Sequence, residues 1–246
     1  MRQKLTVICC SVLQKEVEAL LSRNHPEVEP VFIDSMLHMD PERLQQAMEK
    51  VMAERPDSSF LIVYGDCHPY MSSMEGLPYC ARTKGVNCTE ILLGKEAYTR
   101  HKKEEAFFFL PEWCKRWKEV FEARLGFTDP SLAREFMQET RKKLLYLDTG
   151  VSPVPETTLS EISAFFGMPV EKLSVSSENL SGEIESALKM LLWTDVNENA
   201  ELLLSQLRED LLLNILAHSE DIGKCAVHIA SQIREIIGVR VVALFE

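Results

Sequence analysis

Short apolar runs that alternate with amphipathic helical stretches constrain the fold of this chain more than any other feature of its sequence. Residues 59–64 form the clearest apolar run, residues 5–9 and 31–33 form two more, and helical spacing fills the intervals. Strands separated by helices of this length join as βαβ units, which build a parallel sheet with right-handed crossovers. The sequence therefore predicts an α/β fold, a mostly parallel sheet with flanking helices.

The same alternation continues to about residue 195. Asp40-Pro41 and Asp129-Pro130 each place a capping carboxylate before a proline at the first helical position, which predicts two helix starts. Three more strands are expected, at residues 106–110, 143–147 and 170–175. Three more helices are expected, at residues 111–124, 158–166 and 181–193. We expect residues 1–195 to form one α/β domain.

After this domain the chain becomes rich in leucine. Residues 200–218 carry a heptad spacing with an asparagine on the seam, which favours a signalling helix paired in a homodimer. A helix that packs on its own domain fits the same spacing. We assign residues 196–219 to this linker helix and residues 220–246 to the start of a second α/β, sensor-like domain. Its apolar strand at residues 240–245 has no strand after it to pair with, so we expect the chain to be cut inside that domain.

Charge and composition exclude several functions. The net charge of −11 argues against nucleic acid or anionic lipid as the main partner. Apolar runs are too short for a membrane-spanning helix or a secretory signal, so we expect no membrane insertion. The seven cysteines are an odd, loosely spread set in a chain without an export signal. They indicate a reducing, cytoplasmic location with free thiols or metal thiolates.

The most informative cluster follows the strand at residues 59–64. In a parallel sheet, ligands bind in the loops that leave the carboxyl ends of the strands. Gly65 allows the chain to turn sharply after Tyr64, and Cys67 and His68 then lie in the loop. Cys9 and Cys10 end the first strand, His38 follows the second, and Cys88 lies in a later loop. Convergence of three thiolates and one or two imidazoles would suit zinc, iron or a cofactor that contains iron or cobalt.

Each of these residues also has a purely structural interpretation. Cysteine is among the most buried residue types, so Cys67 and Cys88 are equally consistent with inert core thiols. Neighbouring strand residues point to opposite faces, so we expect one of Cys9 and Cys10 to face the site and the other the core. His38 has the alternative of capping a loop. Asp148, in Asp148-Thr149-Gly150, is expected in a cofactor-facing loop, with a plain strand-to-loop turn as the alternative.

Read together, these segments resemble the domain-of-unknown-function family 1638 over roughly residues 4–193. The resemblance is carried by Cys9, Leu37-His38-x-x-Pro41, Tyr64-Gly65-x-Cys67, Cys88-x-x-x-Leu92-Leu93-Gly94, Phe107–Phe109, Trp113 and Leu147-Asp148-x-Gly150. The doubled thiol at Cys9-Cys10 leaves open which of the two matches the family position. The family often lies near genes of corrinoid-dependent methyl transfer and carries no settled activity, so the resemblance implies site positions and adds a corrinoid to the expected cofactors.

Residues 199–245 separately resemble the signalling helix and opening helix–strand of a GAF sensor domain. The resemblance is carried by Ile229-Ala230-x-x-Ile233-x-x-Ile236-x-Gly238-x-x-Val241 and Ala243-Leu244-Phe245. It implies that the first domain passes a signal to an output domain.

Three hypotheses follow. The first is a sensory input module that binds a metal or a metal-containing small molecule. Its expected metal ligands are Cys9, Cys10, Cys67 and Cys88, and its expected cofactor-binding residues are His38, Tyr64, Gly65, His68 and Asp148. The second is a thiolate–metal enzyme or accessory protein of corrinoid or one-carbon methyl transfer. The third is a structural module whose thiols belong to the core. The sequence does not decide whether the chain catalyses a reaction.

Overall fold

A computed structural model describes residues 4–192, except 69, 75, 76 and 78, together with residues 205, 206, 208 and 209. The chain divides into two units, Met1–Trp193 and Thr194–Glu246, and the fold described below is that of the first. The linker helix and the sensor-like domain expected at residues 196–246 lie almost entirely outside the described residues. Among those residues, no helix combines the length and the apolar character needed to cross a membrane.

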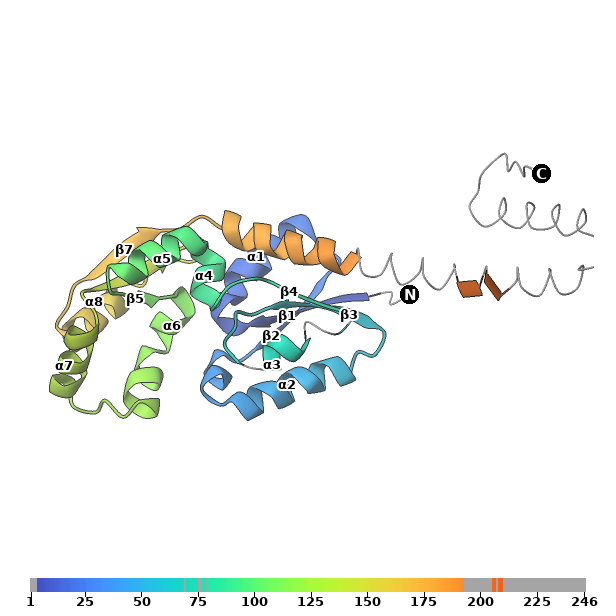
Figure 1. The fold of residues 1–246 in the computed structure, drawn as a ribbon. Helices are drawn as coiled ribbons and strands as arrows, with labels where there is room; N and C mark the ends of the chain where they lie inside the picture. The colour runs from blue at the N-terminus through green and yellow to red at the C-terminus, as the bar shows by residue number, and fades with distance from the viewer. Residues whose placement is uncertain are drawn as a thin grey trace, which may run out of the picture. The chain divides into compact units, whose positions relative to one another are not determined.

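The first unit is an α/β structure with two parallel sheets, which we call sheet A and sheet B (Figure 1). Sheet A has the order β2-β1-β3-β4 and sheet B the order β5-β6-β7. The parallel α/β architecture expected from the sequence is confirmed, but the strands divide into two sheets instead of forming one. Apolar periodicity identifies a strand without naming its neighbour, and it therefore gave no sign of this division.

Sheet A is built from the first 82 residues. Its strands are β1 (Lys4–Cys10), β2 (Glu29–Ile33), β3 (Ser58–Val63) and β4 (Cys80–Arg82). The elements between them are η1 (Ser11–Leu13), α1 (Gln14–Asn24), η2 (Ser35–Met39), α2 (Pro41–Ala53) and α3 (Tyr70–Met74). β1 and β3 are central and almost continuously apolar, as expected for strands covered on both faces. Pro30 lies in β2, an edge strand, where its missing N–H costs no ladder bond.

Sheet B is built from the second half of the unit. Its strands are β5 (Ala106–Phe109), β6 (Lys143–Asp148) and β7 (Val170–Ser174). The helices that precede or connect them are α4 (Cys88–Leu93), α5 (Lys95–Lys103), α6 (Pro111–Lys115), the π-helix η3 (Glu119–Arg124), α7 (Pro130–Thr140) and α8 (Glu156–Phe166). The stretch expected as one helix at residues 111–124 is thus split into α6 and η3.

The helix starts expected at the two Asp-Pro pairs are confirmed. The Asp40 carboxylate accepts a hydrogen bond from the Arg43 N–H at 3.2 Å, and Pro41 is the first residue of α2. The Asp129 carboxylate accepts one from the Ser131 N–H at 2.8 Å, and Pro130 opens α7. In both helices the side-chain oxygen satisfies a backbone donor that has no partner inside the helix.

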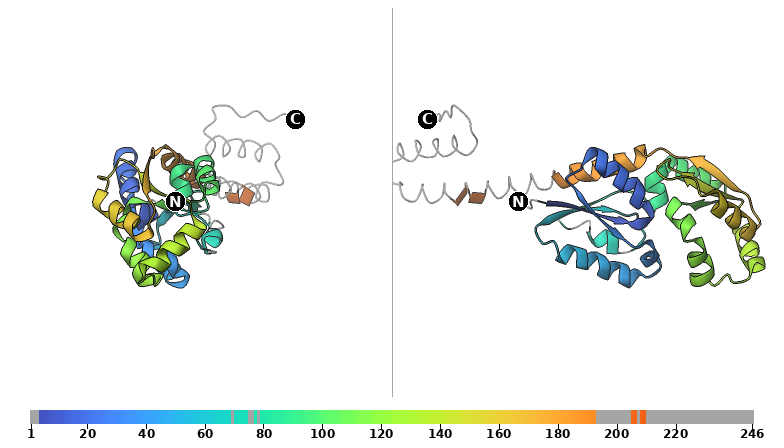
Figure 2. Two further views of the ribbon diagram at one scale, coloured as in Figure 1. Left: turned by 90° about the vertical axis from the view of Figure 1, so that its left-hand side faces the viewer. Right: turned by 180° about the vertical axis from the view of Figure 1, so that it is seen from behind.

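The two sheets meet at the carboxyl ends of their strands. Two hydrophobic clusters make up the core, one around each sheet. Leu110, Leu147 and Val175, just beyond or at the ends of β5, β6 and β7, nevertheless belong to the cluster of sheet A. Met36 of η2 belongs in turn to the cluster of sheet B. Figure 2 shows the same arrangement from behind, with the two sheets end to end. Ligand-binding edges of both sheets therefore face one another.

After β7 the chain returns to sheet A. Residues 178–192 are helical, and Leu180, Ile184 and Leu188 of this helix are buried in the sheet A cluster. The His25 ring at the end of α1 also hydrogen-bonds the Glu185 carboxylate at 2.7 Å. The helix at residues 178–192 therefore packs on sheet A and is joined through the chain to β7 of sheet B.

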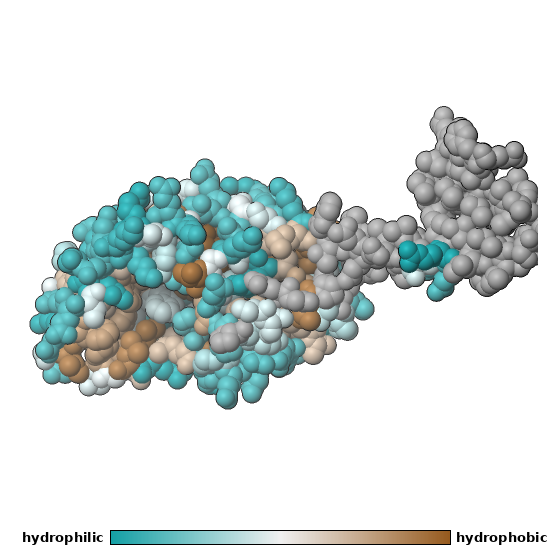
Figure 3. Space-filling view, in the orientation of Figure 1, coloured by the Kyte–Doolittle hydropathy of each residue, from teal (hydrophilic) through white to brown (hydrophobic). Residues whose placement is uncertain are grey.

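Several apolar side chains are exposed to solvent at the outer end of the sheet B half. Leu125, Leu132 and Phe136 are each about half exposed, at 47%, 53% and 48%. Apolar colouring gathers over this part of the molecule in Figure 3. None of these side chains lines the cavity between the sheets that is described below.

Candidate functional site

A cavity of about 180 Å³ lies where the two sheets meet. Cys10, Cys67, Cys88 and His38 line it, and we call it the thiol cavity. Cys10 is the last residue of β1, Cys67 follows β3 by four residues, and Cys88 is the first residue of α4 after β4. These strands are neighbours in sheet A and run parallel, so their ends share one edge.

His38 completes the set and comes from the carboxyl end of β2, the remaining strand of sheet A. It lies in η2, the short 3₁₀ helix that follows β2. The Asp34 carboxylate caps η2 by accepting a hydrogen bond from the Met36 N–H at 2.9 Å. The Ser35 N–H donates to the Ser11 hydroxyl at 2.8 Å, which ties η2 to the end of β1. These two backbone hydrogen bonds fix η2, and η2 in turn holds the His38 imidazole near the thiols.

The loop that carries Cys67 is held by its contacts with the following loop. Gly65 is buried, and a Cβ on it would lie 2.3 Å from the Asn87 Cα atom, so no other residue fits. The Asp66 N–H donates to the Gly85 carbonyl at 3.0 Å. The Asp66 carboxylate pairs with Arg82 at 2.7 Å, and that guanidinium is only 8% exposed. These contacts bring the residue before Cys88 against the loop of Cys67.

The sheet B half closes the other side of the cavity with apolar and aromatic side chains. Phe108 of β5, Leu110 and Trp113 of α6 contribute from this half, beside Val12 of η1. Near them, Arg116 pairs with the Asp34 carboxylate that caps η2 and with Glu119 at 2.8 Å. The lining thus combines these apolar side chains with the thiols, the His38 imidazole and the polar side chains of Ser35, Asn87 and Thr89.

The surroundings of the site shift the pKa values of Cys67 and Cys88 in opposite directions. A hydrogen bond with Cys88 and, next, one with His38 lower the pKa of Cys67 to about 5, against the effect of burial. The pKa of His38 is raised, chiefly by its hydrogen bond with Cys67. The pKa of Cys88 is raised well above its ordinary value, because it hydrogen-bonds to Cys10 and Cys67 and is buried. These shifts favour a thiolate at Cys67 paired with a protonated imidazole at His38, and a neutral thiol at Cys88.

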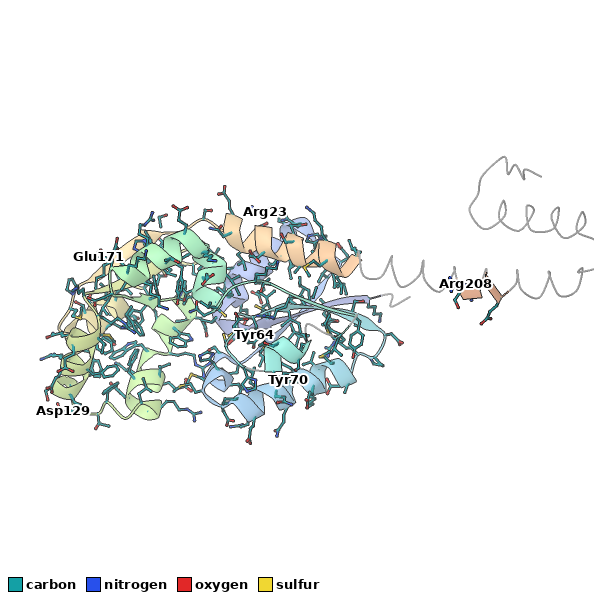
Figure 4. All side chains as sticks on the ribbon, viewed as in Figure 1. Arg23, Tyr64, Tyr70, Asp129, Glu171 and Arg208 are labelled. Carbon is teal, nitrogen blue, oxygen red and sulfur yellow. The ribbon has the colours of Figure 1, made fainter. Side chains whose placement is uncertain are left out.

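Tyr64 adds an unsatisfied polar group to this arrangement. Its side chain is 1% exposed, and its hydroxyl has no hydrogen-bond partner among the described residues. Burial, and then the neighbouring thiols Cys10, Cys9 and Cys88, raise its pKa well above the ordinary value. Figure 4 labels Tyr64 between the two halves of the unit, at the end of β3. Tyr64 does not line the thiol cavity, and its hydroxyl lies buried near these thiols.

The two residues of the Cys9-Cys10 pair have different surroundings. Cys10 lines the cavity, whereas Cys9 is fully buried and donates its S–H to the Cys10 carbonyl at 3.2 Å. Burial is also the main cause that raises the pKa of Cys9. A neutral thiol in the core has no route to a metal ion without rearrangement.

His68 and Asp148 do not line the thiol cavity. The His68 ring accepts a hydrogen bond from the Tyr70 N–H at 3.0 Å, at the start of α3. The Asp148 carboxylate accepts one from the Gly150 N–H at 3.0 Å, which is the strand-to-loop turn that the sequence also allowed. Its neighbour Thr149 donates to the buried Glu16 carboxylate at 2.8 Å and so links sheet B to α1. Both side chains therefore make local turn contacts and do not line the cavity.

Sequence reasoning did not single out several residues that shape the cavity. Arg82 and Arg116 act through ion pairs between segments far apart in the chain, and single-sequence patterns carry no signal for such pairs. Asn87 is the helix cap of α4, accepting a hydrogen bond from the Glu90 N–H at 2.9 Å. An Asn directly before an apolar helical stretch was a readable signal for this cap.

The thiols do not form a ready-made metal centre. Among the residues that the structure describes, no group of three or more His, Cys, Asp and Glu side chains is arranged to hold a metal ion. A structural zinc ion usually takes four protein ligands and a catalytic one three. The donor set therefore fits a ligand that takes one or two thiolates from the protein better than it fits a zinc ion held by the protein alone.

Comparison with known proteins gives one positive result. A family model described as "Protein of unknown function (DUF1638)" matches residues 32–182. Neither the curated proteins nor the solved structures contain a match, and no comparison supports the GAF-like interpretation of residues 199–245. The matched segment covers more than half of the chain and contains His38, Cys67 and Cys88 of the thiol cavity. The chain therefore belongs to the DUF1638 family.

Proposed function

We propose that the chain is a cytoplasmic sensory input module that binds a small thiophilic ligand in the thiol cavity. The ligand is a soft metal ion or a small molecule that contains one. The observation that carries this proposal is the meeting of three thiols and an imidazole at one cavity. A ligand that contains a soft metal fits these groups, because thiolates and imidazoles are the donors that soft metals prefer.

Cavity size narrows the choice among the cofactors expected from the sequence. The volume of about 180 Å³ is below the roughly 300–1,000 Å³ of pockets that hold drug-sized ligands. A corrin macrocycle exceeds such ligands in size, so the volume of the cavity favours a metal ion or a small metal complex over a corrinoid. Zinc or iron would enter with small ligands of its own, such as water or a thiol, because the described part of the chain holds no group of three or more ligands in place.

The fold offers a way to pass binding on to the rest of the chain. The cavity is lined from both halves of the unit, so a bound ligand favours one packing of sheet A against sheet B. The helix at residues 178–192 is packed on sheet A and follows directly from β7 of sheet B. A change between the halves would therefore move this helix, which leads into residues 193 onward.

Metal uptake by the purified chain tests the proposal. We expect the reduced protein, incubated with Zn²⁺, Fe²⁺ or Cu⁺ and a small thiol and then desalted, to retain about one metal ion per chain. Cys67→Ser should lower the retained metal at least tenfold, since serine is a poor ligand for soft ions. Cys80→Ser is the matched control, because Cys80 is also half-buried but does not line the cavity.

Two results would contradict the proposal. One is that no metal remains bound under any of these conditions. The other is that Cys67→Ser and Cys80→Ser retain as much metal as the unsubstituted chain, which would favour core thiols without a ligand.

A second candidate is a thiolate enzyme or accessory protein of one-carbon or corrinoid methyl transfer. The low pKa of Cys67, about 5, favours it, because a thiolate is the nucleophile that accepts a methyl group. Incubation with a methylated donor would then add one methyl group to Cys67, detected by peptide mass. A sensory module would instead bind its ligand without any such addition.

A further inference from the structure

Cys88 is placed to react with a neighbouring thiol. It lines the thiol cavity together with Cys10 and Cys67. These two neighbours differ in access, since Cys10 is 5% exposed and Cys67 is half-buried at the cavity. A reagent that enters from solvent therefore meets Cys67 first, and Cys88 is a neighbouring thiol in the same cavity.

The cavity admits only a small reagent. Its volume of about 180 Å³ holds a few molecules the size of water, each of which occupies about 30 Å³ in the liquid. Hydrogen peroxide fits this space, and so does a short alkyl hydroperoxide. The apolar lining of Val12, Phe108 and Trp113 disfavours highly charged oxidants.

We propose that Cys67 is the site at which hydroperoxides oxidise this protein, and that Cys88 then joins it in a reversible disulfide. This inference concerns the regulation of the site described under the proposed function, because the disulfide removes two thiols that the ligand would use. Oxidation and ligand binding are therefore mutually exclusive. The inference does not depend on which ligand binds.

The chemistry balances with groups of the site. The Cys67 sulfur attacks one peroxide oxygen, its S–H bond and the O–O bond break, and the leaving hydroxide takes the thiol proton to become water. Cys67 is then a sulfenic acid. The Cys88 sulfur attacks the Cys67 sulfur, the S–S bond forms, and the hydroxyl group leaves with the Cys88 proton as a second water. Two thiols are oxidised by two electrons and one hydroperoxide is reduced. A cellular dithiol reverses the change by exchange.

Peptide mapping after mild oxidation tests this assignment. The full chain carrying Cys80→Ser is reduced, desalted, treated with one equivalent of hydrogen peroxide, alkylated and digested with trypsin. The background substitution is needed because Cys67 and Cys80 share the tryptic peptide of residues 51–82, whereas Cys88 lies in residues 85–95. We expect these two peptides to be disulfide-linked in most chains and released by a reductant.

Two variants make the test specific. With Cys88→Ser, Cys67 should remain a sulfenic acid that dimedone traps, whereas Cys114→Ser should leave the linked peptides unchanged, since Cys114 lies in the other core cluster. A link between Cys88 and the peptide of residues 5–15, a link between two chains, or no link at one equivalent would each overturn the inference. Metal uptake by the reduced protein is measured separately, so a chain that forms the disulfide without binding metal would contradict only the proposed function.

Discussion

Iodoacetamide should alkylate Cys67 at a rate that is already near its maximum at pH 6 and falls by half at about pH 5. The lowered pKa of about 5 means that the reactive thiolate is fully present above that pH and is lost as the pH falls through it. A thiol with the ordinary pKa of about 8.5 would show, at pH 6, only about 0.3% of its maximal rate. The expected difference, relative to each thiol's own maximum, is roughly 300-fold.

The causes of the lowered Cys67 pKa indicate which variants should raise the pH midpoint of its alkylation. Cys88 makes the largest contribution and His38 the next, so Cys88→Ala should raise the midpoint more than His38→Asn does. Peptide-resolved mass spectrometry between pH 4 and pH 10, in the Cys80→Ser background, measures each profile. A Cys67 rate that still rises tenfold per unit between pH 7 and pH 8 would show that the thiolate–imidazolium pair does not form.

The sequence predicted where chemistry-bearing residues would lie but not how they pair. Strand ends in a parallel sheet share an edge, and this rule alone brought Cys10, His38, Cys67 and Cys88 into consideration. Their protonation states depend on contacts such as Cys67 with His38, which join residues almost thirty positions apart. No periodicity encodes such contacts. Tyr64 was expected at the site, but its lack of a partner became visible only with its neighbours in place.

The elements of the fold were predictable to the extent that they carry a local signal. β1 and β3 are long apolar runs, and α2 and α7 begin at Asp-Pro pairs, so all four were expected. β4 has only three residues and was missed, because its backbone pairing with β3 stabilises a segment too short to show alternation. The division into two sheets was missed for a related reason, since it is set by which strands pair.

Gly65→Ala should destabilise the protein by about 1–3 kcal/mol or more, the cost of overpacking a close-packed site. The added Cβ would lie 2.3 Å from the Asn87 Cα atom and 2.5 Å from its backbone nitrogen, so backbone must move apart. For a chain of this size, each kcal/mol lowers the melting temperature by roughly 2–4 °C. We therefore expect a decrease of about 2–12 °C, measured by differential scanning calorimetry on the reduced protein.

Gly182→Ala provides the matched control for this substitution. Gly182 is exposed in the helix at residues 178–192, and a Cβ there meets nothing within 4 Å. Alanine is favoured over glycine in a helix by up to about 1 kcal/mol, so this variant should be unchanged or slightly more stable.

The two variants should also differ in the alkylation of Cys67. Moving Asn87 away from Gly65 carries Cys88 away from Cys67, so Gly65→Ala should raise the pH midpoint of Cys67 alkylation and Gly182→Ala should not. Equal melting temperatures and equal midpoints for the two variants would mean that the close approach of these loops does not position the thiols.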